Sequence, residues 1–167
     1  VETDGTAEKK LAAVQEYAAQ ERWDAAVALL REVATSRPDA VVRVSPGRSL
    51  SLPRYCDVLL TRLPRAALEV YRKGVDPQAA VWLAEADATG DERALRSIVD
   101  RAFLSSAGDE AAWRLAERAW ERGEFDLARR HWTSLVPIGE SRAGGAPAVL
   151  RYPDPDVDLA AVRARLV

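Results

Sequence analysis

Histidine and cysteine are scarce in this sequence, which restricts catalysis by a nucleophile paired with a histidine base. The 167 residues include one histidine, His131, and one cysteine, Cys56. A Ser–His–Asp or Cys–His arrangement would have to use His131 as its base, because the nucleophile needs a base within hydrogen-bond reach. His131 lies beside Trp132 in a predicted helix and has no flanking motif. We therefore interpret it as a surface or packed helical histidine.

The other candidates for chemistry also favour a structural role. Cys56 stands in the helical run Tyr55-Cys56-Asp57 without a second motif, and we expect a buried thiol. No His/Cys cluster has the spacing of metal ligands, and carboxylates alone give no ligand pattern. Gly144-Gly145 lacks the lysine and hydroxyl residue of a phosphate-binding loop. We expect no catalytic residue, no metal and no cofactor, and an enzyme is the least favoured function.

The tryptophans favour binding over catalysis. Trp113 and Trp120 are seven residues apart in one predicted helix, so they share a face. Aromatic side chains in a groove suit peptide binding. The alternative, that a neighbouring helical hairpin covers both tryptophans, stays open. Glu110, Glu117 and Glu121 belong to the same face, and these three glutamates with the two tryptophans form the candidate partner-binding face. A partner there should be apolar with basic residues.

Two predicted helices and a tight turn within residues 107–137 must position this face. The first helix has an apolar stripe at the spacing i, i+3, i+4, i+7 and i+8, made by Ala112, Leu115, Ala116, Ala119 and Trp120. Gly123 can adopt the left-handed conformation that ends a helix. The second stripe contains Phe125, Ala128, Trp132 and Leu135, and Pro137 stops it. Such short helices cannot bury their faces alone, so we searched the chain for repeats.

Alanines recur at the spacing of a helical repeat. Ala94 and Ala128 are 34 residues apart, and Ala26 precedes Ala94 by 68, twice that number. Tyr17 and Pro38 occupy the matching first-helix and closing positions of the first unit. The chain thus resembles the tetratricopeptide class, whose helix–turn–helix unit has about 34 residues. The resemblance is imperfect, since Trp82 stands where a small residue belongs and residues 43–76 do not match.

This resemblance implies an all-α fold in which antiparallel helical hairpins stack as a short α–α superhelix. We expect a helical-repeat domain over residues 1–136, with hairpins at about 7–38, 77–104 and 109–136 and an irregular two-helix insert at 52–74. Gly74 should end one insert helix, and Asp76-Pro77 should begin the next helix. Residues 41–52 form either a long loop or a short β-hairpin. Residues 137–156 should be a loop or linker, and 157–167 should begin a further helix whose partner lies beyond Val167.

A second resemblance covers about residues 50–136. It rests on short runs in and at the ends of the predicted helices. These runs are Leu63-Pro64, Ala67-Leu68, Tyr71-Arg72, Asp76-Pro77-Gln78-Ala79, Gly90-Asp91, Gly108-Asp109-Glu110-Ala111 and Arg122-Gly123-Glu124-Phe125. The pattern is similar to the helical region that precedes the β-propeller in bacterial proteins with PQQ-like repeats. It implies an accessory module of a cell-envelope protein, and it does not imply that this segment binds PQQ. A periplasmic or envelope location follows from the resemblance, while a cytoplasmic one stays open.

The composition narrows the possible partners. The net charge of −2 is unlike the basic surface of a nucleic-acid-binding protein, so we expect no nucleic acid. No apolar run approaches ~20 residues, so we expect no membrane insertion. The sequence contains no methionine and begins with Val1, so we expect either a segment of a longer protein or a processed protein. The favoured function is a protein-interaction or scaffold module that binds a protein or peptide. The alternative is a structural spacer that packs against its own downstream propeller.

The glutamates on the candidate face also restrict the type of partner. Tetratricopeptide modules that clamp a C-terminal carboxylate use lysine and asparagine on this face. Here Glu110, Glu117 and Glu121 stand there instead. A partner held by its free acidic C-terminus is therefore disfavoured.

Overall fold

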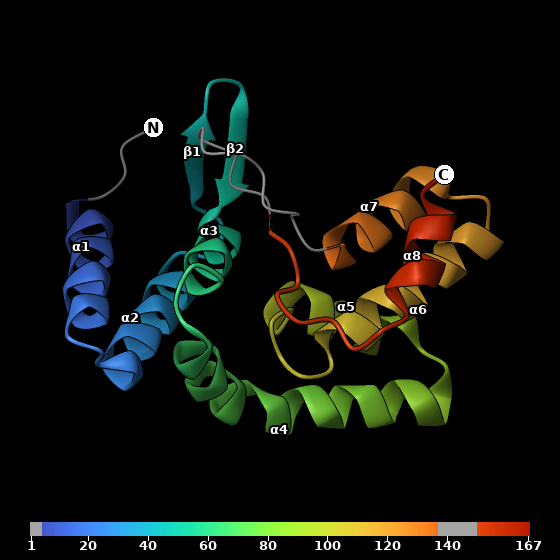
Figure 1. The fold of residues 1–167 in the computed structure, drawn as a ribbon, viewed down its shortest axis with the longest axis horizontal. Coiled ribbons are helices and arrows are strands. Elements are labelled where there is room, and N and C mark those ends of the chain that lie inside the picture. The colour runs from blue at the N-terminus through green and yellow to red at the C-terminus, as the bar shows by residue number, and fades with distance from the viewer. Residues whose placement is uncertain (1–4, 137–149) are drawn as a thin grey trace. The chain divides into compact units, whose positions relative to one another are not determined.

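The structure, a computed structural model, describes residues 5–136 and 150–167. Over these residues the chain is predominantly helical, with two short strands, which confirms the all-α expectation in its broad form (Figure 1). In chain order the elements are α1 (Gly5–Ala19), α2 (Trp23–Ser36), β1 (Val41–Ser45), β2 (Arg48–Ser51), α3 (Leu52–Leu60), α4 (Arg65–Thr89), α5 (Glu92–Arg101), α6 (Gly108–Glu121), α7 (Phe125–Leu135) and α8 (Leu159–Arg165).

The described residues form two compact units. The first comprises residues 5–71 with Leu150, and the second comprises residues 72–136 with 151–167. The border between the units falls inside helix α4. Each unit is described by itself below.

In the first unit, helix α2 supplies the core. It packs on α1 and on α3, and its buried face contains Ala26, Val27, Leu30 and Val33. These four positions follow the 3.6-residue period of an amphipathic helix, and the sequence predicts them as inward-facing. The turn between α1 and α2 closes through the Arg22 N–H, which donates to the Tyr17 carbonyl at 2.9 Å. Lys10 and Glu32 form a surface ion pair between the two helices at 2.7 Å.

Of the two alternatives for residues 41–52, the structure contains the short hairpin. Strands β1 and β2 pair antiparallel, with Val42 opposite Leu50. Gly47 has a φ of 75° in the turn, a conformation that glycine adopts without steric cost. Helix α3 follows β2 directly and buries Cys56, as the sequence predicts. Burial, and secondarily the neighbouring Asp57, raises the pKa of this thiol to about 12, so the thiol is protonated at neutral pH.

The predicted helix break at Gly74 to Pro77 is wrong. Helix α4 runs without interruption from Arg65 to Thr89 and contains Pro77 in its interior. Proline removes one backbone donor and crowds the preceding turn, but buried Val75 and Ala79, one turn apart, hold both sides of it. Asp76 does not act as an N-cap. Its carboxylate accepts hydrogen bonds from the N–H (2.9 Å) and Oγ (2.7 Å) of Ser106.

In the second unit, each helix from α5 to α7 packs on the helix that follows it in the chain. Helix α5 packs on α6, α6 on α7, and α7 on α8. Asp91 caps α5, since its Oδ1 accepts a hydrogen bond from the Arg93 N–H at 2.8 Å. Gly123 has a φ of 76° between α6 and α7, and the Glu124 N–H donates to the Ala119 carbonyl at 2.9 Å. This is the helix-ending geometry that the sequence predicts at Gly123.

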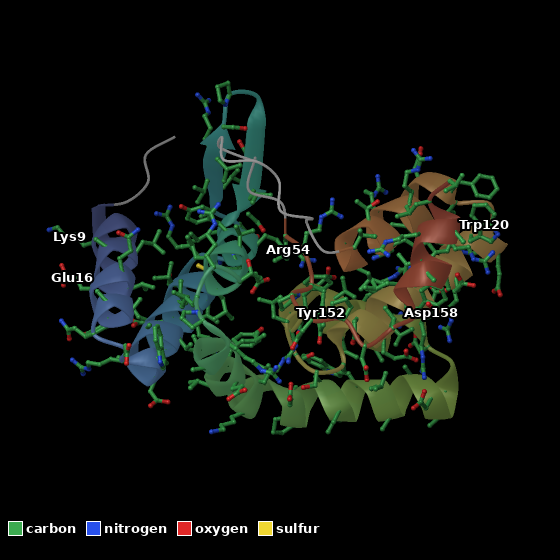
Figure 2. The ribbon with its side chains drawn as sticks, viewed as in Figure 1. Lys9, Glu16, Arg54, Trp120, Tyr152 and Asp158 are labelled. Carbon is green, nitrogen blue, oxygen red and sulfur yellow. The ribbon has the colours of Figure 1, made fainter. Side chains whose placement is uncertain are left out.

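Helix α8 lies within residues 157–167, where the sequence predicts the start of a further helix. Asp158 caps the helix through hydrogen bonds from the Ala160 and Ala161 N–H groups (Figure 2). Val162 is fully buried. Helix α8 packs on α7, so α7 is a packing partner of α8 among the described residues.

Within the predicted loop at 137–156, the structure describes only residues 150–156. They contain no helix or strand, but Tyr152 is buried (Figure 2). The Tyr152 hydroxyl donates to the Ser105 carbonyl at 2.7 Å and accepts from Arg72 Nη2 at 3.0 Å. Arg72 also pairs bidentately with Asp154, at 2.9 and 2.6 Å. The Asp156 N–H donates to the buried Asp109 carboxylate at 2.7 Å. We call residues 152–156 the anchor segment.

Candidate interaction surface

The candidate partner-binding face lies on α6, and its two tryptophans belong to a larger aromatic group. Trp113 is half-buried, and Trp120, near the end of α6, is 40% exposed (Figure 2). Their ring centroids lie 6.4 Å and 5.6 Å from that of Trp132, which is buried in α7. Neither Trp113 nor Trp120 is a fully enclosed core residue. The prediction that they form a binding groove stays a prediction.

Phe125, which the sequence interpretation placed among core positions, extends the aromatic surface. It is 57% exposed at the first position of α7, and its ring packs edge-on against Trp120 with centroids 4.8 Å apart. Trp113, Trp120, Phe125 and Trp132 are called the aromatic cluster below. The turn at Gly123 brings Trp120 and Phe125 together, because it reverses the chain between them. Two exposed aromatic side chains in contact form an apolar patch at this end of the hairpin.

The three glutamates of the candidate face have different environments. Glu110 pairs with Arg114 at 2.6 Å, and Arg114 also pairs with Asp87. Glu117 pairs with Arg165 of α8 at 2.9 Å. Glu121 is exposed, and the described part of the chain gives it no ion-pair partner. The negative charge of the face is therefore partly compensated, and Glu121 contributes most of what remains.

Arg165 is a component of this surface that the sequence interpretation missed. Its guanidinium carbon lies 5.9 Å from the ring centroid of Trp120 and 5.8 Å from that of Trp132. A cation within about 6 Å of an indole is attracted to the negative face of the ring. The available signal was the i, i+3 spacing of Val162 and Arg165, which places both on one side of α8. That local pattern does not predict the ion pair of Arg165 with Glu117, which lies 48 residues earlier in the chain.

Two polar atoms in this region are buried without a hydrogen-bond partner among the described residues. They are the Oε1 of Glu117 and the indole Nε1 of Trp132. Buried polar groups are usually satisfied, since leaving one unpaired costs free energy. Arg165 satisfies only the other oxygen of Glu117. The surface therefore retains an unused acceptor and an unused donor.

The remaining candidates for chemistry do not gather into a site. His131 is half-buried on α7, and Cys56 belongs to the other unit. Within residues 5–136 and 150–167, no three His, Cys, Asp or Glu side chains form a group that could hold a metal ion. Gly144-Gly145 lies outside the described residues.

Comparison with known proteins gives no relative. No protein-family model, curated protein or solved structure matches the chain. Among the described helices, none has both the length and the apolar character needed to cross a bilayer.

Proposed function

We propose that this chain is a non-enzymatic protein-interaction or scaffold module that binds its partner on the aromatic cluster. The observation that carries the proposal is the exposed Trp120–Phe125 pair beside Glu121. Interface hot spots are enriched in aromatic side chains, which bury a large area at a small entropic cost. A partner segment would combine apolar side chains with basic ones, which complement Glu121 and Glu117.

The proposal includes a tetratricopeptide-like stacking of helical hairpins and a place in a bacterial cell-envelope protein beside a PQQ-like propeller. Two features support the stacking. The pairs α1–α2 and α6–α7 are both packed helical hairpins with tight turns. Each turn contains a residue with positive φ, Glu21 at 55° and Gly123 at 76°. The envelope assignment rests only on the resemblance of residues 50–136.

A structural spacer is the second candidate, and one observation favours it. Helix α8, which follows the cluster in the chain, already contacts the cluster through Arg165. A spacer would use the surface only for contacts within its own protein. A scaffold would leave Trp120 and Phe125 open to a separate partner.

Selection from a random peptide library on the purified chain tests this function. We expect the selected peptides to be apolar and basic. Their affinity should fall ~30-fold for Phe125→Ala, because an aromatic anchor contributes about 2 kcal/mol or more when truncated at an interface. Val81→Ala is the matched control, since Val81 is also exposed and apolar but lies on α4. Equal affinities for the two variants, or failure to select any peptide on both the unchanged chain and its variant Arg165→Ala, would contradict the proposal and favour the spacer.

A further inference from the structure

Helix α8 rests on the aromatic cluster through few side chains. In this seven-residue helix, Val162 is buried and Leu159 and Ala161 are half-buried. Arg165 contacts the rings of Trp120 and Trp132. Helices shorter than about 12–15 residues are marginal in water by themselves. Helix α8 is therefore ordered mainly by its contacts with the rest of the unit.

The anchor segment holds the chain just before α8 and not within it. Tyr152 and Asp154 are bound to Arg72, and the Asp156 N–H is bound to Asp109. These bonds involve neither Val162 nor Arg165. Release of α8 would not require these bonds of the anchor segment to break. The contacts that hold α8 itself are those of Val162, Arg165 and its half-buried residues Leu159 and Ala161.

Arg165 forms a hydrogen bond with only one of the two carboxylate oxygens of Glu117. It donates one hydrogen bond to Glu117 Oε2, at 2.9 Å, while Glu117 Oε1 stays buried without a partner among the described residues. A guanidinium can donate two parallel hydrogen bonds to one carboxylate while stacking on an aromatic ring. An arginine that approaches from a suitable direction would satisfy both oxygens. Such an arginine would form one more hydrogen bond to Glu117 than Arg165 does.

We propose that α8 is a displaceable cover of the aromatic cluster, and that the partner carries an arginine which replaces Arg165 between Trp120, Trp132 and Glu117. The inference rests on the proposed function, and it adds the chemistry of the partner's key residue and the competition with α8. A ligand shifts such an equilibrium only through its greater affinity for one state. Here the partner binds only the uncovered surface.

The test uses the full chain and a fluorescent synthetic peptide with the sequence of residues 157–167. Arg165→Ala in the chain removes the contact of the cover without touching its buried residue. The labelled peptide should bind this variant at least tenfold more tightly than the unchanged chain. Arg163→Ala is the matched control, because Arg163 is exposed on the same helix and no contact with the cluster is recorded for it. That variant should bind the peptide no better than the unchanged chain.

Changes in the peptide test the role of the arginine. A peptide with Arg165→Ala should lose binding to the uncovered variant. A peptide with Arg165→Lys should bind at least several-fold more weakly, because an ammonium lacks the planar guanidinium that stacks on the rings of Trp120 and Trp132. Val162→Asp in the chain is a second way to release α8 and should raise binding as well. Equal binding of the labelled peptide to all chain variants would overturn the proposal.

Two results separate this inference from the proposed function. If library-selected peptides bind the unchanged chain and Arg165→Ala equally, and still depend on Phe125, then the cover is wrong and the proposed function stands. If the labelled peptide binds only the uncovered variant while no library peptide binds any form, then the cover is supported and the proposed function fails.

Discussion

Ala128 is the position where one added side chain should matter most for the α6–α7 pair. It has no exposed surface and lies in the helix that packs along α6. Extra methyl groups at a filled position force neighbouring side chains and backbone apart, at a cost of roughly 1–3 kcal/mol. We expect Ala128→Leu to lower the free energy of unfolding in urea by this amount. Ala80→Leu, on the exposed side of α4, should change it by less than about 0.5 kcal/mol. Equal losses would show that Ala128 is not at a close crossing.

Because of Asp57, we expect the free energy of unfolding to decrease as the pH rises from 4 to 7. Burial raises the pKa of its carboxyl to about 7, against the lowering effect of Arg54 one turn earlier. An ordinary carboxyl group titrates near pH 4, so the folded protein holds a proton that the unfolded chain has lost. This contribution to stability is complete below pH 4 and is lost as the pH rises to 7.

Asp57→Asn should therefore flatten the decline in unfolding free energy between pH 4 and pH 7 and stabilise the protein at pH 8. Urea unfolding at four pH values from 4 to 8 measures this. Asp39→Asn, which removes the same charge from an exposed turn, is the control. A decline that persists in Asp57→Asn would mean that another group is responsible.

At the scale of the elements, the anchor segment should depend on one hydroxyl group. Tyr152→Phe removes the donor to the Ser105 carbonyl and the acceptor of Arg72 Nη2 while keeping the ring that packs edge-on against Phe103. Unsatisfied buried polar groups cost about 1–3 kcal/mol. We expect that loss of stability, together with faster amide hydrogen exchange in residues 151–167.

Tyr55→Phe is the control for this experiment, because the Tyr55 hydroxyl forms no hydrogen bond with another described residue. It should leave exchange in residues 151–167 unchanged. Slow exchange there in Tyr152→Phe would show that other contacts hold the anchor segment.

The elements that sequence could predict are those set by local patterns. The α6–α7 hairpin follows from an apolar stripe, a glycine with positive φ and a second stripe. The same reasoning was wrong at Pro77. Local rules treat a proline as the end of a helix, and they contain no information about the hydrogen bond between Asp76 and Ser106, 30 residues later. The links from Arg72 to Asp154 and from Glu117 to Arg165 span 82 and 48 residues. Periodicity in the sequence does not predict such contacts, so the anchor segment and the contact between Arg165 and Glu117 were missed.

At the scale of the whole molecule, the two units should respond separately to a cavity. Leu30 is buried in the first unit, and Leu135 is buried in the second. Truncating a buried leucine to alanine typically costs 2–5 kcal/mol. We expect Leu30→Ala to speed amide exchange in residues 9–71, and Leu135→Ala to do so in residues 72–136 and 151–167. Hydrogen exchange read by mass spectrometry measures both. Equal acceleration in both units would instead indicate one cooperative structure.

The short connection between the anchor segment and α8 has a quantitative consequence for any competitor. Asp156, held by Asp109, precedes the Asp158 cap by only two residues. A ligand on so short a tether is present at its own site at an effective concentration on the order of millimolar. A separate segment at micromolar concentration, making the same contacts, would therefore almost never displace it. It would need contacts about a thousandfold stronger, worth about 4 kcal/mol. The tether thus sets a threshold that excludes chance arginine-bearing segments and admits only a partner built for this surface.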